Sequence, residues 1–181
     1  SQLKDYNFKT NSDTEIIIAL YEKYGQNFLK HLPGMFALAL WDNQNQSLLI
    51  ARDRFGEKPL YYAIGKNNEL IFASEIKAII ASGLIEPIIN RDTLSHYLHK
   101  LYIQPQQTIY ENIHTLSPAH ILIFKNQKLT ISRYWNMPQI NNHITLDEAL
   151  PEFKRLLTEA VKKQLVADVS VGAFLSGGLD S

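Results

Sequence analysis

A change in residue pattern at positions 136–145 most constrains what this chain can fold into. Before it, short apolar segments of strand length alternate with turns. The stretch itself is polar, contains Pro138 and has no helical or strand periodicity, which is typical of a linker. The pattern therefore predicts a strand-rich α+β part over residues 1–135, a linker over 136–144, and the beginning of an α/β unit over 145–181.

The first part is expected to form layered, largely antiparallel strands with helices outside. Apolar segments flanked by polar turns or glycine predict hairpins. The paired segments are, in chain order, 35–41 with 47–51, 59–64 with 70–73, and 120–124 with 129–132.

Capping residues mark the predicted helices. Ser12 and Glu15 have the spacing of a capping box before an apolar stretch with helical periodicity, and Gly25 is a stop signal for that helix. Ser74 is expected to cap a helix that runs to Ile80. A further helix is expected over residues 91–100.

The second part is predicted to be a long helix, a short buried strand and a loop. Residues 145–148 mark the helix start, residues 169–175 are the expected strand, and the loop leaves its end. The helix has one apolar face, which consists of Phe153, Leu156, Leu157, Ala160, Val161 and Leu165.

The loop at 176–181 reads Ser-Gly-Gly-Leu-Asp-Ser. Gly172 and Gly177 have the spacing of a Walker A loop, but Gly178 and Leu179 replace its Lys-Ser/Thr, which excludes that motif. Adjacent glycines let backbone N–H groups approach an anion, and serine hydroxyls add donors. An aspartate suits Mg²⁺ that bridges to phosphate oxygens. The loop is therefore predicted to bind the pyrophosphate of ATP; the alternative is an ordinary polar turn.

Several motifs resemble those of the glutamine-hydrolysing asparagine synthetase family and follow the same order. The Ser-Gly-Gly-Leu-Asp-Ser loop looks like the PP-loop of ATP pyrophosphatases. The other motifs that carry the resemblance are SDTE at 12–15, GMFA at 34–37, ARDRFGEKPLYY at 51–62, FASEIKA at 72–78 and ADV at 167–169. The resemblance covers essentially the whole chain. It implies the C-terminal part of an Ntn-type αββα glutaminase domain, then the start of a PP-loop α/β synthetase domain.

The resemblance also implies residue roles. Asp13 would bind the α-ammonium group of glutamine, and an acid in the first turn of a helix would also suit the helix dipole. Met35 would line an ammonia tunnel, with ordinary strand packing as the alternative. Asp180 would help to hold Mg²⁺. The residues expected at the ATP site are Leu175, Ser176, Gly177, Gly178, Leu179, Asp180 and Ser181.

No catalytic residue is expected in this chain. Members of the family hydrolyse glutamine with an N-terminal cysteine, whereas this chain has no cysteine and begins with Ser1. A serine nucleophile is the alternative, because a terminal amine can activate a hydroxyl group. The residues after Ser1 do not resemble the family's start, and the motif that contains Asp13 normally lies well inside the domain. The chain is therefore expected to be an internal fragment without activity of its own.

The resemblance implies an ATP-dependent carbon–nitrogen ligase. Ammonia from glutamine would convert aspartate to asparagine through an acyl-adenylate, with release of AMP and pyrophosphate. One alternative is a homologue that amidates another carboxylate, for example on a sugar of a surface polysaccharide. A second is a cyclase similar to β-lactam synthetase with a vestigial glutaminase domain, and a third is a non-enzymatic binding or scaffold module.

Charge and composition limit the expected partners. The net charge is zero, which argues against nucleic acid and anionic membranes as partners. No apolar stretch is long enough to span a bilayer and no signal peptide is evident, so a cytoplasmic location is expected. The expected ligands are glutamine, aspartate or another carboxylate, and ATP with Mg²⁺, and a homodimer is one expectation for the oligomeric state. Structural ion pairs at the domain interface are expected among Arg52, Asp53, Arg54, Glu75 and Lys77, with a bearing on catalysis as the alternative.

Overall fold

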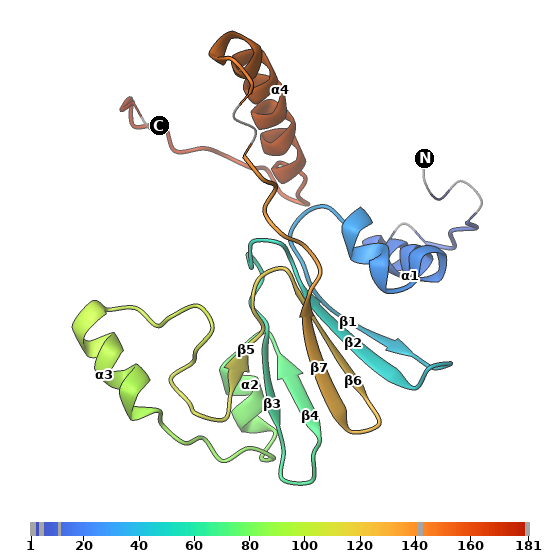
Figure 1. Cartoon of the computed structure of the whole chain (residues 1–181), viewed down its shortest axis with the longest axis vertical. Helices are drawn as coiled ribbons and strands as arrows, with labels where there is room; N and C mark the ends of the chain where they lie inside the picture. Colours follow the sequence, from blue (N-terminus) through green and yellow to red (C-terminus); the bar gives the residue numbers. More distant parts are fainter. Residues whose placement is uncertain (1–2, 4–5, 11, 141–142, 180–181) are drawn as a thin grey trace. The chain divides into compact units, whose positions relative to one another are not determined.

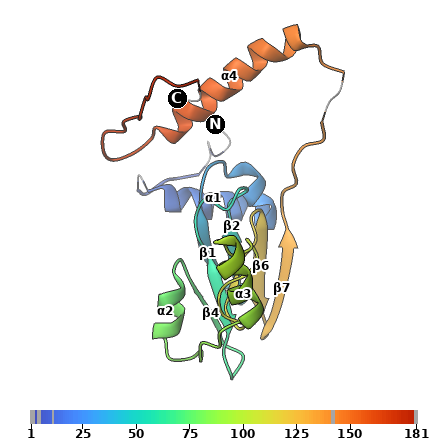
Figure 2. The same cartoon turned by 90° about the vertical axis from the view of Figure 1, so that its left-hand side faces the viewer.

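The computed structural model of the chain describes residues 3, 6–10, 12–140 and 143–179. It divides into two compact units, Ser1–Asn136 (unit 1) and Met137–Ser181 (unit 2), which are described separately. Figures 1 and 2 show the elements of each unit from two directions. Within the described residues, no helix combines the length and the apolar character that a bilayer crossing requires.

Unit 1 contains seven strands, three α-helices and one 3₁₀ helix in its described part. In chain order they are α1 (Asp13–Tyr24), the 3₁₀ helix η1 (Gly25–His31), β1 (Ala37–Asp42), β2 (Ser47–Arg52), β3 (Tyr61–Ile64), β4 (Leu70–Ala73), α2 (Ile76–Ala81), α3 (Arg91–Lys100), β5 (His114–Thr115), β6 (His120–Lys125) and β7 (Lys128–Arg133).

The strands form two antiparallel sheets (Figure 1). One has the order β1-β2-β6-β7 and is called sheet A, and the other has the order β4-β3-β5 and is called sheet B. All three predicted hairpins are confirmed, because β1 pairs with β2, β3 with β4 and β6 with β7. The pairing of β2 with β6 then joins two hairpins that are far apart in the sequence into one sheet.

Three hydrophobic clusters show that unit 1 has four layers. Alternate residues of β2 point to opposite faces of sheet A, so Leu49 and Ala51 belong to one cluster and Ile50 to another. The first cluster lies between sheet A and the pair α1 and η1, and the second lies between the two sheets. The third packs Ile79 of α2 against Ala63 of β3. The expected αββα order is therefore present: α1 with η1, sheet A, sheet B, and α2.

The start of α1 differs in one contact from its predicted capping box. The Ser12 hydroxyl accepts a hydrogen bond from the Thr14 N–H at 3.2 Å, and Gly25 ends the helix with a φ of 54°, both as expected. The carboxylate of Glu15, however, accepts from the N–H groups of Lys9 and Thr10 at 2.8 Å each. Glu15 therefore secures the chain that enters the helix rather than the N-cap residue.

Other predicted boundaries also shift. The helix assigned to Ser74 begins later, with Glu75 as its N-cap and no side-chain capping bond, so the predicted role of Ser74 is wrong. Strands β1 and β3 start two residues after the predicted positions, and the helix over 91–100 is confirmed. The helix η1 and the strand β5 are not among the predicted elements. Both are short and depend on partners from elsewhere in the chain: η1 buries Phe28 in the first cluster and β5 pairs with β3.

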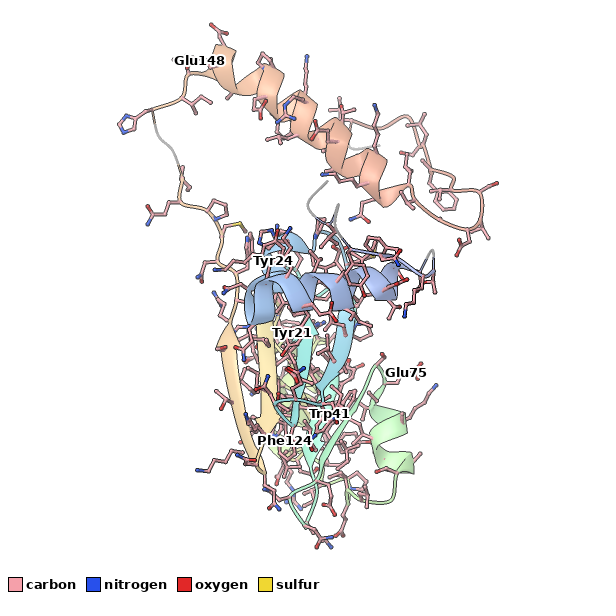
Figure 3. The ribbon with its side chains drawn as sticks, turned by 90° about the vertical axis from the view of Figure 1, so that its right-hand side faces the viewer. Tyr21, Tyr24, Trp41, Glu75, Phe124 and Glu148 are labelled. Atoms are coloured by element: carbon pink, nitrogen blue, oxygen red, sulfur yellow. The ribbon has the colours of Figure 1, made fainter. Side chains whose placement is uncertain are left out.

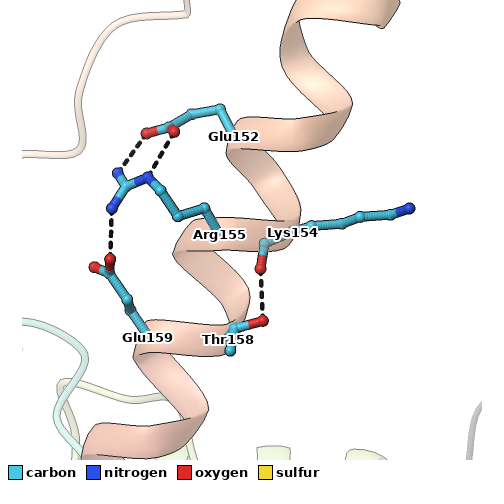
Figure 4. Close-up of polar contacts among 5 residues, drawn as sticks. All are labelled: Glu152, Lys154, Arg155, Thr158 and Glu159. Carbon is cyan, nitrogen blue, oxygen red and sulfur yellow. Dashed lines mark hydrogen bonds and ion pairs between the residues drawn. The ribbon is translucent and has the colours of Figure 1, made fainter.

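Unit 2 contains α4 (Leu146–Gln164), whose start is a complete capping box. Thr145 Oγ1 accepts from the N–H of Glu148, and the Glu148 carboxylate accepts from the N–H of Thr145. Arg155 pairs with Glu152 and Glu159 on the helix surface (Figure 4). Solvent screens such exposed pairs, so they add little to the stability of the helix.

The strand predicted at 169–175 is wrong: this segment carries no strand in the described part of unit 2. Val169 is 76% exposed and Phe174 is fully exposed. A strand requires a neighbour for its backbone hydrogen bonds, and unit 2 offers none among its described residues. The apolar segment at 169–175 has the pattern of a buried strand, but it has no partner strand in the described part of unit 2.

The end of α3 provides a test of backbone strain. Leu101 caps this helix in the left-handed conformation, with a φ of 61°, and its side chain is 79% exposed. A residue with a Cβ is destabilised there by about 1 kcal/mol relative to glycine. Leu101→Gly should therefore raise the free energy of unfolding by about this amount in urea denaturation.

The matched control is Leu98→Gly, which makes the same replacement at an exposed position inside α3. Because glycine is a poor helix former, this change should lower stability by about 0.5–1 kcal/mol. If both variants changed the free energy of unfolding in the same direction, the backbone at Leu101 would not be strained.

Candidate functional site

A cavity of about 510 Å³ lies beside the N-terminal half of α1. Its size lies in the range of small-molecule pockets. One wall comes from α1 and the opposite wall from residues 31–38, which join η1 to β1. The lining residues are Asp13, Thr14, Ile16, Ile17, Leu20, His31, Leu32, Pro33, Met35, Phe36, Ala37 and Leu38. The cavity is thus mainly apolar, with polar groups near the start of the helix.

Asp13 is the first residue of α1 and carries the negative charge of this cavity. Its side chain is exposed, and no side chain in the described part of the chain forms an ion pair with it. The N-terminus of a helix favours a negative charge, and the carboxylate lies where a cationic group could reach it. The arrangement suits a small ligand with an ammonium group.

Met35 lines the same cavity from the opposite wall. It follows Gly34, which has a φ of 100°, and its side chain is 41% exposed. The structure therefore brings together two residues to which the sequence analysis gave adjacent roles, although they lie on different elements. Their assignments to glutamine and to an ammonia tunnel stay predictions.

The loop after β2 is organised around the carboxylate of Asp53, which is 1% exposed. Asp53 accepts hydrogen bonds from the backbone N–H groups of Phe55, Glu57 and Lys58 at 3.0 Å each, and from Phe36 N–H at 3.4 Å. The Asp53 N–H donates to the Phe36 carbonyl at 2.9 Å. Because Phe36 lines the cavity, this loop holds one wall of the candidate site.

Backbone groups also satisfy Arg52. Its guanidinium group donates to the carbonyls of Lys58, Gly56 and Leu116 at 2.7–2.8 Å and to the Thr115 hydroxyl at 3.2 Å. The space beside Gly56 is filled, since an added Cβ would lie 2.8 Å from Pro118 and 3.1 Å from the guanidinium carbon. Arg52 therefore fastens the loop after β2 to the segment before β6.

The expected ion pairs are thus wrong for Arg52 and Asp53: backbone N–H groups surround Asp53, and Arg52 donates to backbone carbonyls and the Thr115 hydroxyl. Arg54 donates to the Lys30 carbonyl at 3.3 Å, and its guanidinium group lies over the Trp135 ring at 5.6 Å. The expected pair between Lys77 and Glu75 is present, at 2.6 Å, but it is exposed. A pattern of charges beside apolar strands does not distinguish a side-chain partner from a backbone partner, because both satisfy a desolvated charge.

The pKa of Asp53 reflects this environment. Burial opposes ionisation, but hydrogen bonds from the backbone N–H groups of Lys58, Glu57 and Phe55 outweigh it and hold the pKa of Asp53 below its ordinary value. The ionised carboxylate is therefore the form that the fold stabilises.

The loop expected to bind ATP lies in unit 2. Leu175 is 78% exposed and Leu179 is fully exposed. Gly177 has a φ of 79° with open space around it, and the Gly178 N–H donates to the Ser176 hydroxyl at 3.4 Å. Asp180 and Ser181 lie outside the described residues.

The donors of this loop fit a phosphate group in their chemistry. They are a serine hydroxyl and glycine N–H groups, and no Cβ or neighbouring atom blocks the approach at Gly177. Among the described residues, no group of His, Asp and Glu side chains is arranged to hold a metal ion. The magnesium assignment depends on Asp180 and stays a prediction.

Two protein-family models match the chain. A model described as "Glutamine amidotransferase domain" matches residues 1–135, and one described as "Asparagine synthase" matches residues 152–181. The first match covers most of the chain and nearly all of unit 1.

Curated relatives match both parts together. The chain is 37% identical over 182 residues to asparagine synthetase [glutamine-hydrolyzing] 3 of Bacillus subtilis, with 98% of this chain and 29% of the relative covered. It is 39% identical over 187 residues to amidase chry2 of Gibberella zeae, with 100% and 27% covered. It is 39% identical over 177 residues to putative asparagine synthetase [glutamine-hydrolyzing] 2 of Methanocaldococcus jannaschii, with 96% and 34% covered. The chain thus spans roughly a quarter to a third of the length of these relatives.

Two solved structures resemble the fold. One is glutamine phosphoribosylpyrophosphate amidotransferase from B. subtilis in complex with ADP and GMP, with a TM-score of 0.50 and 18% identity over 74% of this chain and 25% of that chain. The other is described as the allosteric regulatory enzyme of purine biosynthesis, with a TM-score of 0.52 and 20% identity over 74% and 24%. At such identities the likeness concerns the fold, and it agrees with the glutaminase-type layers of unit 1.

The buried carboxylate of Asp53 generates a prediction about pH. Its pKa is lower in the folded state than in the unfolded chain, so ionised Asp53 stabilises the fold at neutral pH. This contribution is lost as the pH falls below about 4, through the folded-state pKa. Asp53→Asn should therefore lower the free energy of unfolding by at least about 2 kcal/mol at pH 7. The difference from the unmodified protein should shrink in urea denaturation at progressively lower pH.

Glu57→Gln is the control, because Glu57 lies in the same loop with an exposed side chain. It should change stability by no more than about 0.5 kcal/mol. A difference between Asp53→Asn and the unmodified protein that stays constant from pH 7 to pH 3 would show that the charge of Asp53 does not stabilise the fold.

Proposed function

This chain belongs to the family of glutamine amidotransferase domains, and we propose that it supplies the glutamine-binding part of an ATP-dependent enzyme that converts aspartate to asparagine. One observation carries the proposal: an amidotransferase match over residues 1–135 is followed in the same chain by an asparagine synthase match over 152–181. Glutamine hydrolysis and amide formation are then two halves of one reaction, and the chain contains part of each.

The cavity beside α1 is the proposed glutamine site. Asp13 offers a carboxylate at a helix N-terminus, where it would pair with the α-ammonium group of glutamine. The apolar residues behind it suit the methylene groups of the side chain. The cavity holds no cysteine, the residue with which members of the resembled family hydrolyse glutamine, since the chain has none. The role proposed for this chain is therefore to bind and orient glutamine.

Ammonia released from glutamine needs a path with few polar groups, because water would protonate it and remove its nucleophilic lone pair. Met35 lies on the wall of the cavity that leads toward β1, among apolar side chains. This position supports a role in guiding ammonia away from the glutamine site.

The loop of residues 175–181 is the proposed site for ATP, which is a substrate of this reaction. Transfer of the adenylyl group to the aspartate carboxylate, with release of pyrophosphate, would create an acyl-adenylate that ammonia attacks, and AMP would leave. Ser176 and the glycine N–H groups would hold the pyrophosphate oxygens. Magnesium, when bound at Asp180, would neutralise part of the phosphate charge.

A second acceptor is supported by the relatives. Amidase chry2 covers the whole chain at an identity close to that of the asparagine synthetases. The sequence match alone therefore does not single out aspartate as the acceptor of the amide. Amide formation with aspartate, assayed in the full natural chain that contains this sequence, distinguishes the two candidates.

Asp13→Ala tests the glutamine site. A hydrogen bond to a charged group contributes about 1.5–3 kcal/mol. Its loss should therefore raise the glutamine KM by about ten- to a hundredfold. Ammonium salts should still support ATP-dependent synthesis, since the role proposed for Asp13 involves neither ATP nor the acceptor. Steady-state kinetics of the full natural chain with each nitrogen source measure both effects.

The matched control is Asp92→Ala, which removes an acid from the first turn of α3. It should leave the glutamine KM unchanged. If Asp13→Ala removed glutamine- and ammonium-dependent synthesis together, Asp13 would have a folding role, and if it changed neither, the glutamine site would lie elsewhere.

Asp180→Ala tests the synthetase half. It should abolish ATP-dependent amide formation with either nitrogen source and leave glutamine hydrolysis largely intact, because the phosphate groups are needed only for activation of the carboxylate. Product analysis for asparagine and glutamate separates the two activities. Undiminished synthesis in this variant would remove the assignment of the loop to ATP.

A further inference from the structure

The position of α1 on sheet A depends on two kinds of contact. Leu20 is buried beneath the helix, and the Tyr21 ring meets the Phe28 ring edge-on at 5.7 Å. Apolar contacts of this kind are non-directional, so they hold the helix against the sheet without defining its axial position sharply. A directional contact is needed to fix where each residue of α1 lies.

Tyr21 makes such a contact. It lies on the side of α1 that faces the strands (Figure 3), and its hydroxyl donates to Asp42 Oδ2 at 2.7 Å. Asp42 ends β1, so the bond joins the C-terminal half of α1 to the hairpin between β1 and β2. It is partly buried, which limits competition from water.

Hydrogen bonds other than the one from Tyr21 also hold the Asp42 carboxylate in place. Asp42 also accepts from the N–H groups of Gln44 and Asn45 at 2.9 Å and from Asn45 Nδ2 at 2.7 Å. Hydrogen bonds from the Asn45 side chain and, to a smaller extent, from Tyr21 lower the pKa of Asp42 to about 2. Burial and, to a smaller extent, the hydrogen bond to Asp42 raise the pKa of Tyr21 to about 12. Donor and acceptor therefore keep their roles around neutral pH.

The contact reaches the candidate site through the helix itself. Asp13 and Tyr21 belong to one uninterrupted helix and are eight positions apart, or about 12 Å along the axis. A helix transmits a shift at one end to the other because its backbone hydrogen bonds resist extension. The α1 wall of the cavity, with Asp13 at its end, should therefore move relative to residues 31–38 when Tyr21 loses its anchor.

We propose that Tyr21, through its hydrogen bond to Asp42, is a positioning residue that sets glutamine affinity by fixing Asp13 at the mouth of the cavity. The inference rests on the proposed function, since it takes Asp13 as the glutamine ligand. It concerns the binding of glutamine and leaves the ATP-dependent half of the reaction untouched.

Tyr21→Phe in the full natural chain tests the proposal, because it removes the hydroxyl and keeps the ring against Phe28. The glutamine KM should rise about three- to tenfold, while the kcat with glutamine and synthesis from ammonium salts stay the same. Tyr24→Phe is the matched control: it lies on the same helix, and no described residue receives a hydrogen bond from its hydroxyl. Its glutamine KM should not change.

The double variant Tyr21→Phe with Asp13→Ala shows whether Tyr21 acts through Asp13. If it does, Tyr21→Phe should raise the KM no further once Asp13 is absent. Additive effects would overturn the proposal, as would a Tyr21→Phe protein that melts at a lower temperature but keeps its glutamine KM. If Asp13→Ala alone left the glutamine KM unchanged, both the proposed glutamine site and this inference would fail. If Asp13→Ala raised the KM but Tyr21→Phe did not, only this inference would fail.

Discussion

The buried carboxylate of Asp53 is the constraint on which the arrangement of unit 1 depends. A charge with 1% exposure is stable there because four backbone N–H groups donate to it. Three of them fold the loop of residues 53–58, and the fourth, from Phe36, brings in the start of β1. The adjacent Arg52 extends the same principle to the Leu116 carbonyl before β6. Two neighbouring charges of opposite sign thus organise three distant segments without pairing with each other.

These contacts explain how a cavity can persist beside a closely packed core. Asp53 fixes the wall at Phe36, and the apolar cluster beneath α1 fixes the depth of the opposite wall. The hydrogen bond of Tyr21 to Asp42 adds the axial position of the helix. The candidate ligand Asp13 then projects from the end of a helix whose depth and axial position two separate contacts determine. Rigid elements hold a charged group more accurately than a mobile loop would.

The two units use their apolar residues differently. In unit 1, β2 is buried on both faces because α1 and η1 cover one side of sheet A and sheet B covers the other. In unit 2, the apolar face of α4 keeps about half of each large side chain exposed, from Phe153 to Leu165. The apolar residues of α4 nevertheless have the spacing of a helix that packs one face against a partner. Local capping at Thr145 defines where it begins, independently of any partner.

Local signals in the sequence determined the hairpins, the helix over 91–100 and the caps at Ser12 and Thr145, because neighbouring residues make those contacts. The sequence motifs also indicated the amidotransferase family. Tertiary structure alone decided the pairing of β2 with β6, the burial of η1 and the backbone partners of Arg52 and Asp53, since these join residues far apart in the chain. It likewise decided that residues 169–175 form no strand, because an apolar run becomes a strand only where another strand accepts its hydrogen bonds. Tertiary structure also decided that Asp13 and Met35 line one cavity, because only the packing of α1 against sheet A brings them together.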